Sequence, residues 1–294
     1  MKKLNTLISN KNLIIKTKKY TSIIGLFPSK GARSPKLWNR AFKKYGIKNE
    51  MVPFDVKIKN LPRLMKYLNK DQNFIGGCVT VPYKERIFKL LKNNITKTSK
   101  KIGAVNCLFR NKRGQLFGTN TDGEAALKSF ENKFGRVKYK NILLLGPGGA
   151  GKAVASYFSK ALKKNKMLTI VGRSSDSKKF AKKIGAKWQT FKNISKIKFN
   201  EIDVIINCTS IGFLTKKNNS PISKNLFKNL NKNVKIFDII YQPKETKLIK
   251  LAKKKKLKTL NGLDMNLIQA VLAFGYTNKK LGKNNLTKKY MKSF

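Results

Sequence analysis

The chain has 294 residues, of which 67 are lysine or arginine and 13 are aspartate or glutamate, so its formal net charge is +54. It has no histidine, which excludes a histidine-ligated metal site and any catalytic triad that needs an imidazole. Such a charge is typical of nucleic-acid-binding proteins, but here most of the basic residues are lysines spread along the whole chain. We therefore expect weak, non-specific adhesion to polyanions and no specific nucleic-acid partner.

Three features of the sequence indicate the cellular compartment of the protein: its cysteines, its apolar runs and its N-terminus. Cys78, Cys107 and Cys208 lie in apolar, strand-like runs without metal-ligand spacing, which is typical of core residues in a reducing compartment. No apolar run approaches membrane-spanning length, so we expect a cytoplasmic protein with no membrane partner. Residues 1–20 are rich in lysine, lack a secretory cleavage pattern, and are interpreted as a basic extension with a short strand at 13–16.

In the first part of the chain, predicted strands alternate with predicted helices, which indicates an α/β fold with a mostly parallel sheet. Ser34 is expected to be the N-cap of a helix, with Pro35 at the first helical position. A hairpin turn is predicted at 111–114. The expected strands are 21–25, 51–56, 74–81, 104–109 and 115–117, and the expected helices are 34–45, 61–68 and 85–91.

After a boundary at 118–123, the pattern of residues 141–161 indicates a dinucleotide site. An apolar run precedes a glycine cluster, and helix-forming residues follow it. Glycines let the backbone approach a ligand closely, and the start of a helix suits a pyrophosphate. This variant of the dinucleotide fingerprint also occurs at tight connections that bind nothing. Its residues are Gly146, Gly148, Gly149, Ala150 and Gly151.

The next predicted strand, 167–171, indicates which cofactor is bound. Sites that prefer NAD place an acidic residue at this strand end, where it bonds to the ribose 2′-hydroxyl. Here Arg173, Ser174 and Ser175 follow Gly172. A guanidinium and hydroxyls suit a 2′-phosphate, so we predict NADP(H). The alternative is that Arg173 is one more surface cation.

Further strands at 203–208, 234–239 and 259–261, with helices at 124–132 and from residue 265, continue the alternation. The cofactor is expected to lie across the carboxyl ends of these strands, where Thr209 follows one strand. Gly262 precedes the last helix and is a further candidate for the cofactor site.

Taken in order, the motifs resemble the shikimate dehydrogenase family over roughly residues 21–275. Single motifs are weak, but their order is specific. They are Ser34-Pro35 with Asn39, VTVPYKE at 79–85, GAVN at 103–106, NTDG at 120–123, GPGGA at 146–150, NCTS at 207–210 with Gly212, Tyr241, and Gln269.

The resemblance implies a two-domain α/β architecture. A substrate-binding domain would comprise 21–122 together with 265–294, and a Rossmann-type NADP domain would comprise 123–264. The last helix would return to the first domain, and substrate and nicotinamide would meet in the cleft between the domains. The oligomeric state stays open between monomer and homodimer.

The resemblance also implies the reaction, which is reduction of 3-dehydroshikimate to shikimate with hydride from NADPH. Lys84 would be the acid/base, paired with Asp122. The substrate-binding residues would be Ser34, Thr80, Asn106, Thr121, Tyr241 and Gln269. Most of these also have an ordinary structural interpretation. Lys84 could be a solvated surface lysine, and Asp122 a helix cap. The other interpretations are strand-end turns for Asn106 and Thr121, packing for Tyr241 and a polar helix face for Gln269.

One departure from the family pattern leaves undecided which residues bind the carboxylate of the substrate. The family has a Ser-x-Ser pair before the proline, whereas this chain has Ala32 and then Ser34. Ser29, Lys30 or Arg33 are candidates to replace the missing hydroxyl, and Arg33 is suited to bidentate binding of a carboxylate. The change leaves open a paralogue that acts on quinate or another cyclic polyol acid. A nucleotide-binding homologue without catalysis and a nucleic-acid binder are the alternatives from other classes.

Overall fold

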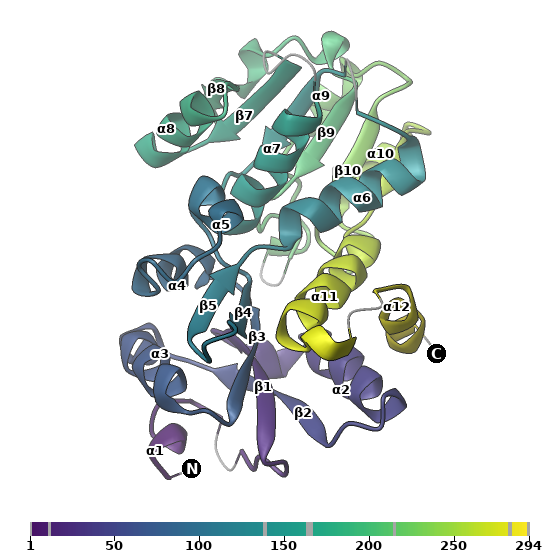
Figure 1. Ribbon diagram of the computed structural model, residues 1–294. Coiled ribbons are helices and arrows are strands. Elements are labelled where there is room, and N and C mark those ends of the chain that lie inside the picture. The colour runs from purple at the N-terminus through teal and green to yellow at the C-terminus, as the bar shows by residue number, and fades with distance from the viewer. Residues whose placement is uncertain are drawn as a thin grey trace. The chain divides into compact units, whose positions relative to one another are not determined.

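The computed structural model describes residues 2–10, 13–137, 140–162, 167–213, 216–281 and 284–292 (Figure 1). The chain forms two compact units. Unit 1 comprises Met1–Thr121 and Leu267–Phe294, and unit 2 comprises Asp122–Asn266. Each unit is organised around one β-sheet.

Unit 1 contains a five-stranded sheet in the order β2-β1-β3-β4-β5. β1 pairs in parallel with β2 and β3, whereas β4 runs antiparallel to both β3 and β5. In consequence β1, β3 and β5 end, and β4 begins, at the same edge of the sheet. The strands are β1 Lys19–Gly25, β2 Asn49–Asp55, β3 Phe74–Val79, β4 Cys107–Arg110 and β5 Leu116–Thr119, which confirms the predicted strands and hairpin within a few residues.

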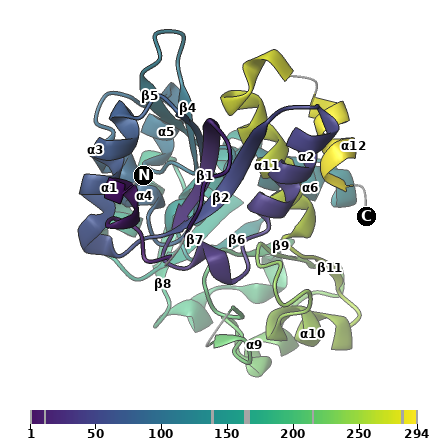
Figure 2. The same cartoon turned by 90° about the horizontal axis from the view of Figure 1, so that it is seen from below.

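Helices cover both faces of this sheet, because successive side chains of a strand point to opposite sides. Ile23 of β1 packs with helices α2, α11 and α12, whereas Ile24 packs with α1, α3 and α4. Figure 2 shows α2 and α11 on one side of β1 and β2, and α3 on the other. The helices are α1 Lys2–Asn5, α2 Ser34–Lys44, α3 Leu61–Lys70, α4 Lys84–Leu90, α5 Lys97–Ile102, α11 Leu263–Thr277 and α12 Asn284–Lys292.

The predicted return of the last long helix to the first domain is seen in unit 1. Trp38 and Phe42 of α2 are fully buried, and the centroid of each ring lies 5.1 Å from that of Phe274 in α11. The predicted N-cap is wrong by one residue. Arg33 holds the cap position with a helical φ of −75°, so Ser34 is already the first residue of α2.

The N-terminal segment is part of the folded unit. Residues 13–16 form no strand, so that prediction was wrong. The backbone N–H groups of Lys16 and Thr17 donate to the side-chain carboxylate of Glu50 in β2, and not to backbone carbonyls as in a strand pair. The described residues of this segment, 2–10 and 13–20, therefore belong to the folded unit and not to a projecting extension, because several of their apolar side chains are buried in its core. These buried side chains are Leu4, Leu7, Ile8 and Ile15.

Unit 2 contains a six-stranded, wholly parallel sheet in the order β11-β10-β9-β6-β7-β8. In chain order this is the 3-2-1-4-5-6 arrangement of dinucleotide-binding folds, in which the strand order reverses between β6 and β9. Its strands are β6 Ile142–Leu145, β7 Leu168–Gly172, β8 Lys187–Thr190, β9 Val204–Asn207, β10 Lys235–Asp238 and β11 Lys258–Leu260. Its helices are α6 Asp122–Phe134, α7 Gly149–Ala161, α8 Ser175–Lys183, α9 Lys224–Lys228 and α10 Lys247–Lys254, and the start of α11.

Several short elements escaped prediction because their sequences are mostly polar and rich in lysine, with only a few apolar residues in each. They are β8 and helices α5, α8, α9 and α12. Cys78 and Cys107 are buried as predicted, and Cys208 is half-buried. Among the helices in the described ranges, none is long and apolar enough to cross a bilayer.

Candidate active site

The glycine turn after β6 contains glycines of two kinds. Gly146 has φ +85°, and a Cβ there would lie 2.6 Å from Cγ2 of Thr209. A Cβ on Gly151 would lie 2.1 Å from the Gly146 carbonyl oxygen. The packing of unit 2 itself therefore requires these two glycines. Gly148 differs, because its φ of −78° suits any residue and a Cβ there would meet nothing within 4 Å.

The open space at Gly148 lies at the N-terminus of α7, where Gly148 is the N-cap. The first N–H groups of a helix have no partner within the helix, and the dipole places partial positive charge there. No acidic residue occurs in the first turn of α7, and no side chain caps it. This arrangement suits a phosphate, as the glycine pattern predicts.

Arg173 and Ser174 follow the neighbouring strand β7 and are exposed. The strand end lies beside the glycine turn, since a Cβ on Gly172 would be 3.1 Å from Cγ of Pro147. The Ser174 hydroxyl oxygen accepts a bond of 3.2 Å from the N–H of Ser177 and so caps α8. Arg173 thus follows a strand end that lies beside the glycine turn, and its bond to a 2′-phosphate stays a prediction.

Thr209 lies on the other side of the glycine turn, after β9. The N–H of Cys208 donates to the Leu145 carbonyl at 2.8 Å, which joins the ends of β9 and β6. The backbone N–H and the hydroxyl of Thr209 both donate to Oδ1 of Asn207, at 3.0 and 2.7 Å. Thr209 is therefore held against Gly146 at the point where the strand order reverses.

The end of β10 contains a buried carboxylate, Asp238, that sequence analysis missed. It accepts bonds from Nδ2 of Asn207 at 3.1 Å, the N–H of Ile240 at 3.1 Å and the Thr246 hydroxyl at 2.6 Å. Burial raises the pKa of Asp238 to about 6, although these three bonds act to lower it. The available signal was that Asn207 and Asp238 are each the next-to-last residue of a predicted strand, 203–208 and 234–239.

Tyr241 and Gly262 lie in unit 2 close to this carboxylate. Tyr241 is half-buried and follows Ile240. The N–H of Gly262 donates to the Ile240 carbonyl at 3.0 Å, and a Cβ on Gly262 would lie 1.9 Å from the Ile239 carbonyl oxygen. Gly262 is thus required by close packing against the segment that carries Tyr241.

In unit 1, three of the predicted substrate-binding residues form one buried polar cluster. Oδ1 of Asn106 accepts from the N–H of Thr121 at 2.8 Å, and Nδ2 of Asn106 donates to the Thr121 hydroxyl at 3.0 Å and to Oε1 of Gln269 at 3.3 Å. Asn106 precedes β4, Thr121 follows β5 and Gln269 lies on α11. The sheet topology therefore brings them together at the edge where β5 ends and β4 begins.

Thr80 and Lys84 lie at the same edge, after β3. The N–H of Thr80 donates to the Ile24 carbonyl at 2.9 Å, and the Lys84 carbonyl accepts from the N–H of Val105 at 2.9 Å. Between them the Val81–Pro82 peptide is cis, and the buried Tyr83 donates its hydroxyl to the Val56 carbonyl at 2.5 Å. Lys84 is half-buried at the start of α4. Its backbone is thus fixed beside Asn106.

The loop between β1 and α2 reduces the number of candidates for the carboxylate site. The N–H of Ser29 donates to Oδ1 of Asp55 at 2.9 Å, and its hydroxyl donates to Oδ2 of the same carboxylate. Ser29 is thus engaged at the end of β2. Lys30 is exposed, with its ammonium 5.2 Å from the centre of the Phe27 ring. Arg33 precedes α2, and Ser34 is buried in its first turn.

Asp122 is buried and is the first residue of α6, in unit 2. The alternative interpretation made Asp122 the cap of this helix, whereas the structure places it one residue further on, as the first residue of the helix itself. Lys84 belongs to unit 1, so the pairing of Lys84 with Asp122 stays a prediction.

Comparison with known families matches both units. A family described as the shikimate dehydrogenase substrate binding domain matches residues 24–108. A second, described as shikimate / quinate 5-dehydrogenase, matches residues 128–247. The chain is 37% identical to the shikimate dehydrogenase (NADP+) of Methanocaldococcus jannaschii over 266 residues, which covers 86% of this chain and 90% of that protein. The corresponding protein of Methanosphaera stadtmanae is 36% identical, with 91% and 92% covered.

Solved structures agree with these similarities. The shikimate dehydrogenase of Aquifex aeolicus superposes with a TM-score of 0.80 at 31% identity, covering 96% of this chain and 100% of that one. A shikimate dehydrogenase in complex with NADP+ gives the same TM-score and identity, with 96% and 98% covered. The Thermus thermophilus shikimate 5-dehydrogenase in complex with NADP(H) and shikimate gives 0.77 at 25% identity, with 93% and 98% covered.

Proposed function

Since the chain belongs to the shikimate dehydrogenase family, we propose that it catalyses the reversible, NADPH-dependent reduction of 3-dehydroshikimate to shikimate. The observation that supports this most strongly is the buried Asn106–Thr121–Gln269 cluster, which suits a substrate with several ring hydroxyls. The amide and hydroxyl groups of this cluster can exchange their bonds to one another for bonds to substrate hydroxyls, and a site that recognises hydroxyls in this way discriminates against analogues that lack them.

The glycine turn and the strand ends of unit 2 fit the cofactor. The pyrophosphate would lie at the open face of Gly148, on the N–H groups of Gly149, Ala150 and Gly151. Arg173, assisted by Ser174, would hold the 2′-phosphate and so favour NADP over NAD. Thr209, Tyr241 and Gly262 would border the nicotinamide half. When bound, the reduced cofactor supplies the hydride.

The chain itself must supply a proton to the ketone oxygen as the hydride arrives. Lys84 is the group we assign to this step, since an ammonium can donate a hydrogen bond and then the proton. Asp122 would accept a hydrogen bond from a substrate hydroxyl, and its negative charge would partner the ammonium of Lys84. Thr80 and Ser34 would complete the polar lining on the side of unit 1.

For the substrate carboxylate, we assign Arg33. Ser29 is bound to Asp55, which leaves Arg33 and Lys30 as candidates from the loop, and a guanidinium binds a carboxylate bidentately. Arg33→Ala should raise the KM for shikimate by about tenfold, as expected for a lost charged hydrogen bond, while the KM for NADP+ stays the same. If Lys30→Ala has this effect and Arg33→Ala does not, the assignment to Arg33 is wrong.

The experiment that tests the proposed function uses Lys84→Met, which keeps the aliphatic stem and removes the ammonium. We expect kcat to fall by about 100-fold or more, since general acid catalysis contributes about 10²–10⁴-fold. NADP+ affinity should be unchanged, because Lys84 lies in unit 1. Lys89→Met, on an exposed position of the same helix, is the matched control. An unchanged kcat in Lys84→Met would remove Lys84 from the mechanism.

Two further points belong to the proposal. Quinate remains the second substrate to test, because Ala32 stands where the family has a serine. We also propose that the enzyme works in the cytoplasm, as a monomer or a homodimer, and sizing chromatography with light scattering distinguishes these two states.

A further inference from the structure

The buried carboxylate of Asp238 joins two loops at the carboxyl end of the unit 2 sheet. Asp238 and Asn207 are the last residues of neighbouring parallel strands and are partners in register. One loop, residues 208–213, carries Thr209. The other, residues 239–246, carries Tyr241. Both loops contain residues assigned above to the nicotinamide half of the cofactor site.

Asp238 determines which way the Asn207 amide points. Nδ2 of Asn207 donates to Asp238 at 3.1 Å and to the Ile211 carbonyl at 3.2 Å, while its Oδ1 accepts the two bonds from Thr209. These four bonds use the whole capacity of the amide. A flipped amide would turn its oxygen toward the carboxylate and its NH₂ toward the N–H of Thr209, so Asp238 excludes that orientation.

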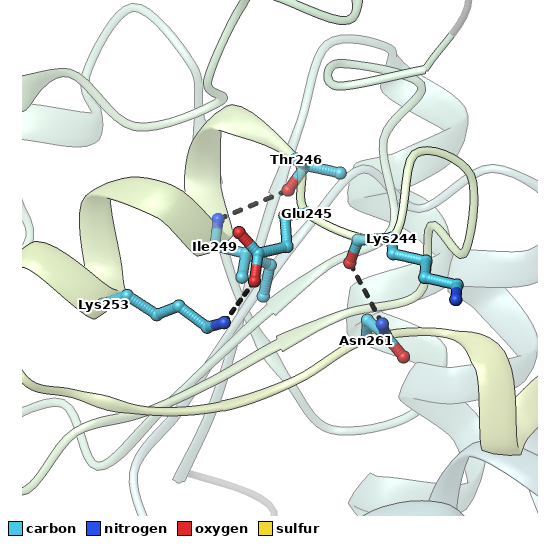
Figure 3. Close-up of polar contacts among 6 residues, drawn as sticks. All are labelled: Lys244, Glu245, Thr246, Ile249, Lys253 and Asn261. Carbon is cyan, nitrogen blue, oxygen red and sulfur yellow. Dashed lines mark hydrogen bonds and ion pairs between the residues drawn. The ribbon is translucent and has the colours of Figure 1, made fainter.

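The second loop is held by the same carboxylate and by the start of α10. The Thr246 hydroxyl donates to Asp238 at 2.6 Å and accepts from the N–H of Ile249 at 3.3 Å, so one side chain caps the helix and bonds the carboxylate. Figure 3 shows this cap together with the bond from Asn261 to the Lys244 carbonyl, 3.0 Å long. Since the N–H of Ile240 also donates to Asp238, the loop is fixed on both sides of Tyr241.

The two loops also pack directly on each other. Gly212 has φ +108°, and a Cβ there would lie 3.2 Å from Cβ of Thr246 and 3.3 Å from Cδ1 of Ile240. At the other end of the first loop, Thr209 contacts Gly146 of the glycine turn. A shift at Asp238 would thus reach both loops that border the nicotinamide half, through the bonds to Asn207, Ile240 and Thr246.

We propose that Asp238 is a positioning residue that, through Asn207 and Thr246, sets the two loops bordering the nicotinamide half of NADP(H), without touching the cofactor. The inference depends on the proposed function, since it assigns a role within that site. It predicts a specific separation of effects. Loss of the carboxylate should disturb the nicotinamide half and leave the adenosine half, at Arg173 and the glycine turn, as it is.

The test compares NADP+ with 2′,5′-ADP, which has the 2′-phosphate but no nicotinamide. In Asp238→Asn, one carboxylate oxygen becomes an NH₂ group and one acceptor is lost. In Asp238→Ala all three bonds are lost. We expect kcat to fall by about 10-fold and about 100-fold respectively, as for small displacements of reacting groups. The dissociation constant of 2′,5′-ADP should stay within about twofold of wild type, whereas that of NADP+ should rise.

The control is Asp203→Asn, which alters a carboxylate at the opposite end of β9, where Asp203 accepts a bond of 2.8 Å from the N–H of Asn141. This variant should leave kcat and the dissociation constants of NADP+ and 2′,5′-ADP unchanged. The double variant Asp238→Asn/Asn207→Ala should lose less activity than the product of the two single losses, because both single variants break the shared Asn207 branch while only Asp238→Asn also affects the Thr246 branch. Additive losses would contradict the proposal.

Two other results would overturn the proposal: an unchanged kcat in both Asp238 variants, or an equal loss of affinity for NADP+ and 2′,5′-ADP, which indicates general damage to unit 2. Failure of the proposed function is a separate result, namely no turnover of shikimate by the wild-type enzyme. In that case calorimetry with the two nucleotides still tests the role of Asp238.

Discussion

Replacing Asp238 by asparagine should change how the stability of unit 2 depends on pH. The ordinary pKa of this carboxyl is 3.8, and burial raises it to about 6 in the folded protein. The folded state therefore binds the proton more tightly than the unfolded state. The contribution of Asp238 to stability is fully present below pH 3.8 and is lost as the pH rises through about 6. Asparagine does not titrate.

The size of the effect follows from the pKa difference, which is about two units and corresponds to about 3 kcal/mol at most. The free energy of unfolding of Asp238→Asn, minus that of the wild type, should rise by up to this amount between pH 4 and pH 7.5. Other carboxyls contribute equally to both proteins and cancel in the difference. The chain has no histidine, so no unperturbed side chain titrates near pH 6 in either protein.

The assay is urea unfolding followed by tryptophan fluorescence. The chain has two tryptophans, Trp38 in unit 1 and Trp188 in β8 of unit 2. In a Trp38→Phe background the remaining Trp188 reports on unit 2 alone. A stability difference that stays flat with pH would show that Asp238 is solvated in the folded state. A difference that falls toward neutral pH would show that its three hydrogen bonds outweigh burial.

Arg173→Asp should weaken NADP+ binding by more than tenfold while NAD+ binding changes little, since the charge that pairs with the 2′-phosphate is reversed; equal losses for both cofactors would refute the assigned role. Gly148→Ala should keep the melting temperature and lose NADP+ affinity, because its Cβ meets no protein atom but occupies the space for the pyrophosphate. Gly146→Ala, by contrast, should lower the melting temperature, and if the two variants melt alike the distinction between these glycines fails. Arg110→Lys should destabilise unit 1 by about 3 kcal/mol in urea unfolding, because all five guanidinium N–H groups bond to backbone carbonyls and an ammonium has only three. A loss below about 0.5 kcal/mol, the usual range for surface substitutions, would mean that water replaces those bonds.

The parts of the fold that sequence predicts well are those whose cause is local. The apolar run and glycines at 142–151 give β6, the turn and α7, because only glycine accepts φ +85° at Gly146 next to Thr209. The period of the apolar residues gives α2 and its buried face. The order of the motifs also places Asn106, Thr121 and Gln269 in one site, and the structure brings them into contact in unit 1.

The parts that sequence misses depend on contacts between distant segments. Asn207 and Asp238 are 31 residues apart and meet only because β9 and β10 are neighbours in register. Ser29 is a reasonable candidate for binding a carboxylate until the structure shows it bound to Asp55. The lysine-rich start of the chain hides the apolar side chains of Leu4 and Leu7, which are buried in the core.

The most direct test of the whole account is the formation of NADPH when the purified protein is mixed with NADP+ and shikimate. We predict a steady rise in the absorbance of the reduced nicotinamide, a slower rise with quinate or with NAD+, and loss of the signal in Lys84→Met. No rise with shikimate, while quinate or NAD+ supports turnover, would contradict it.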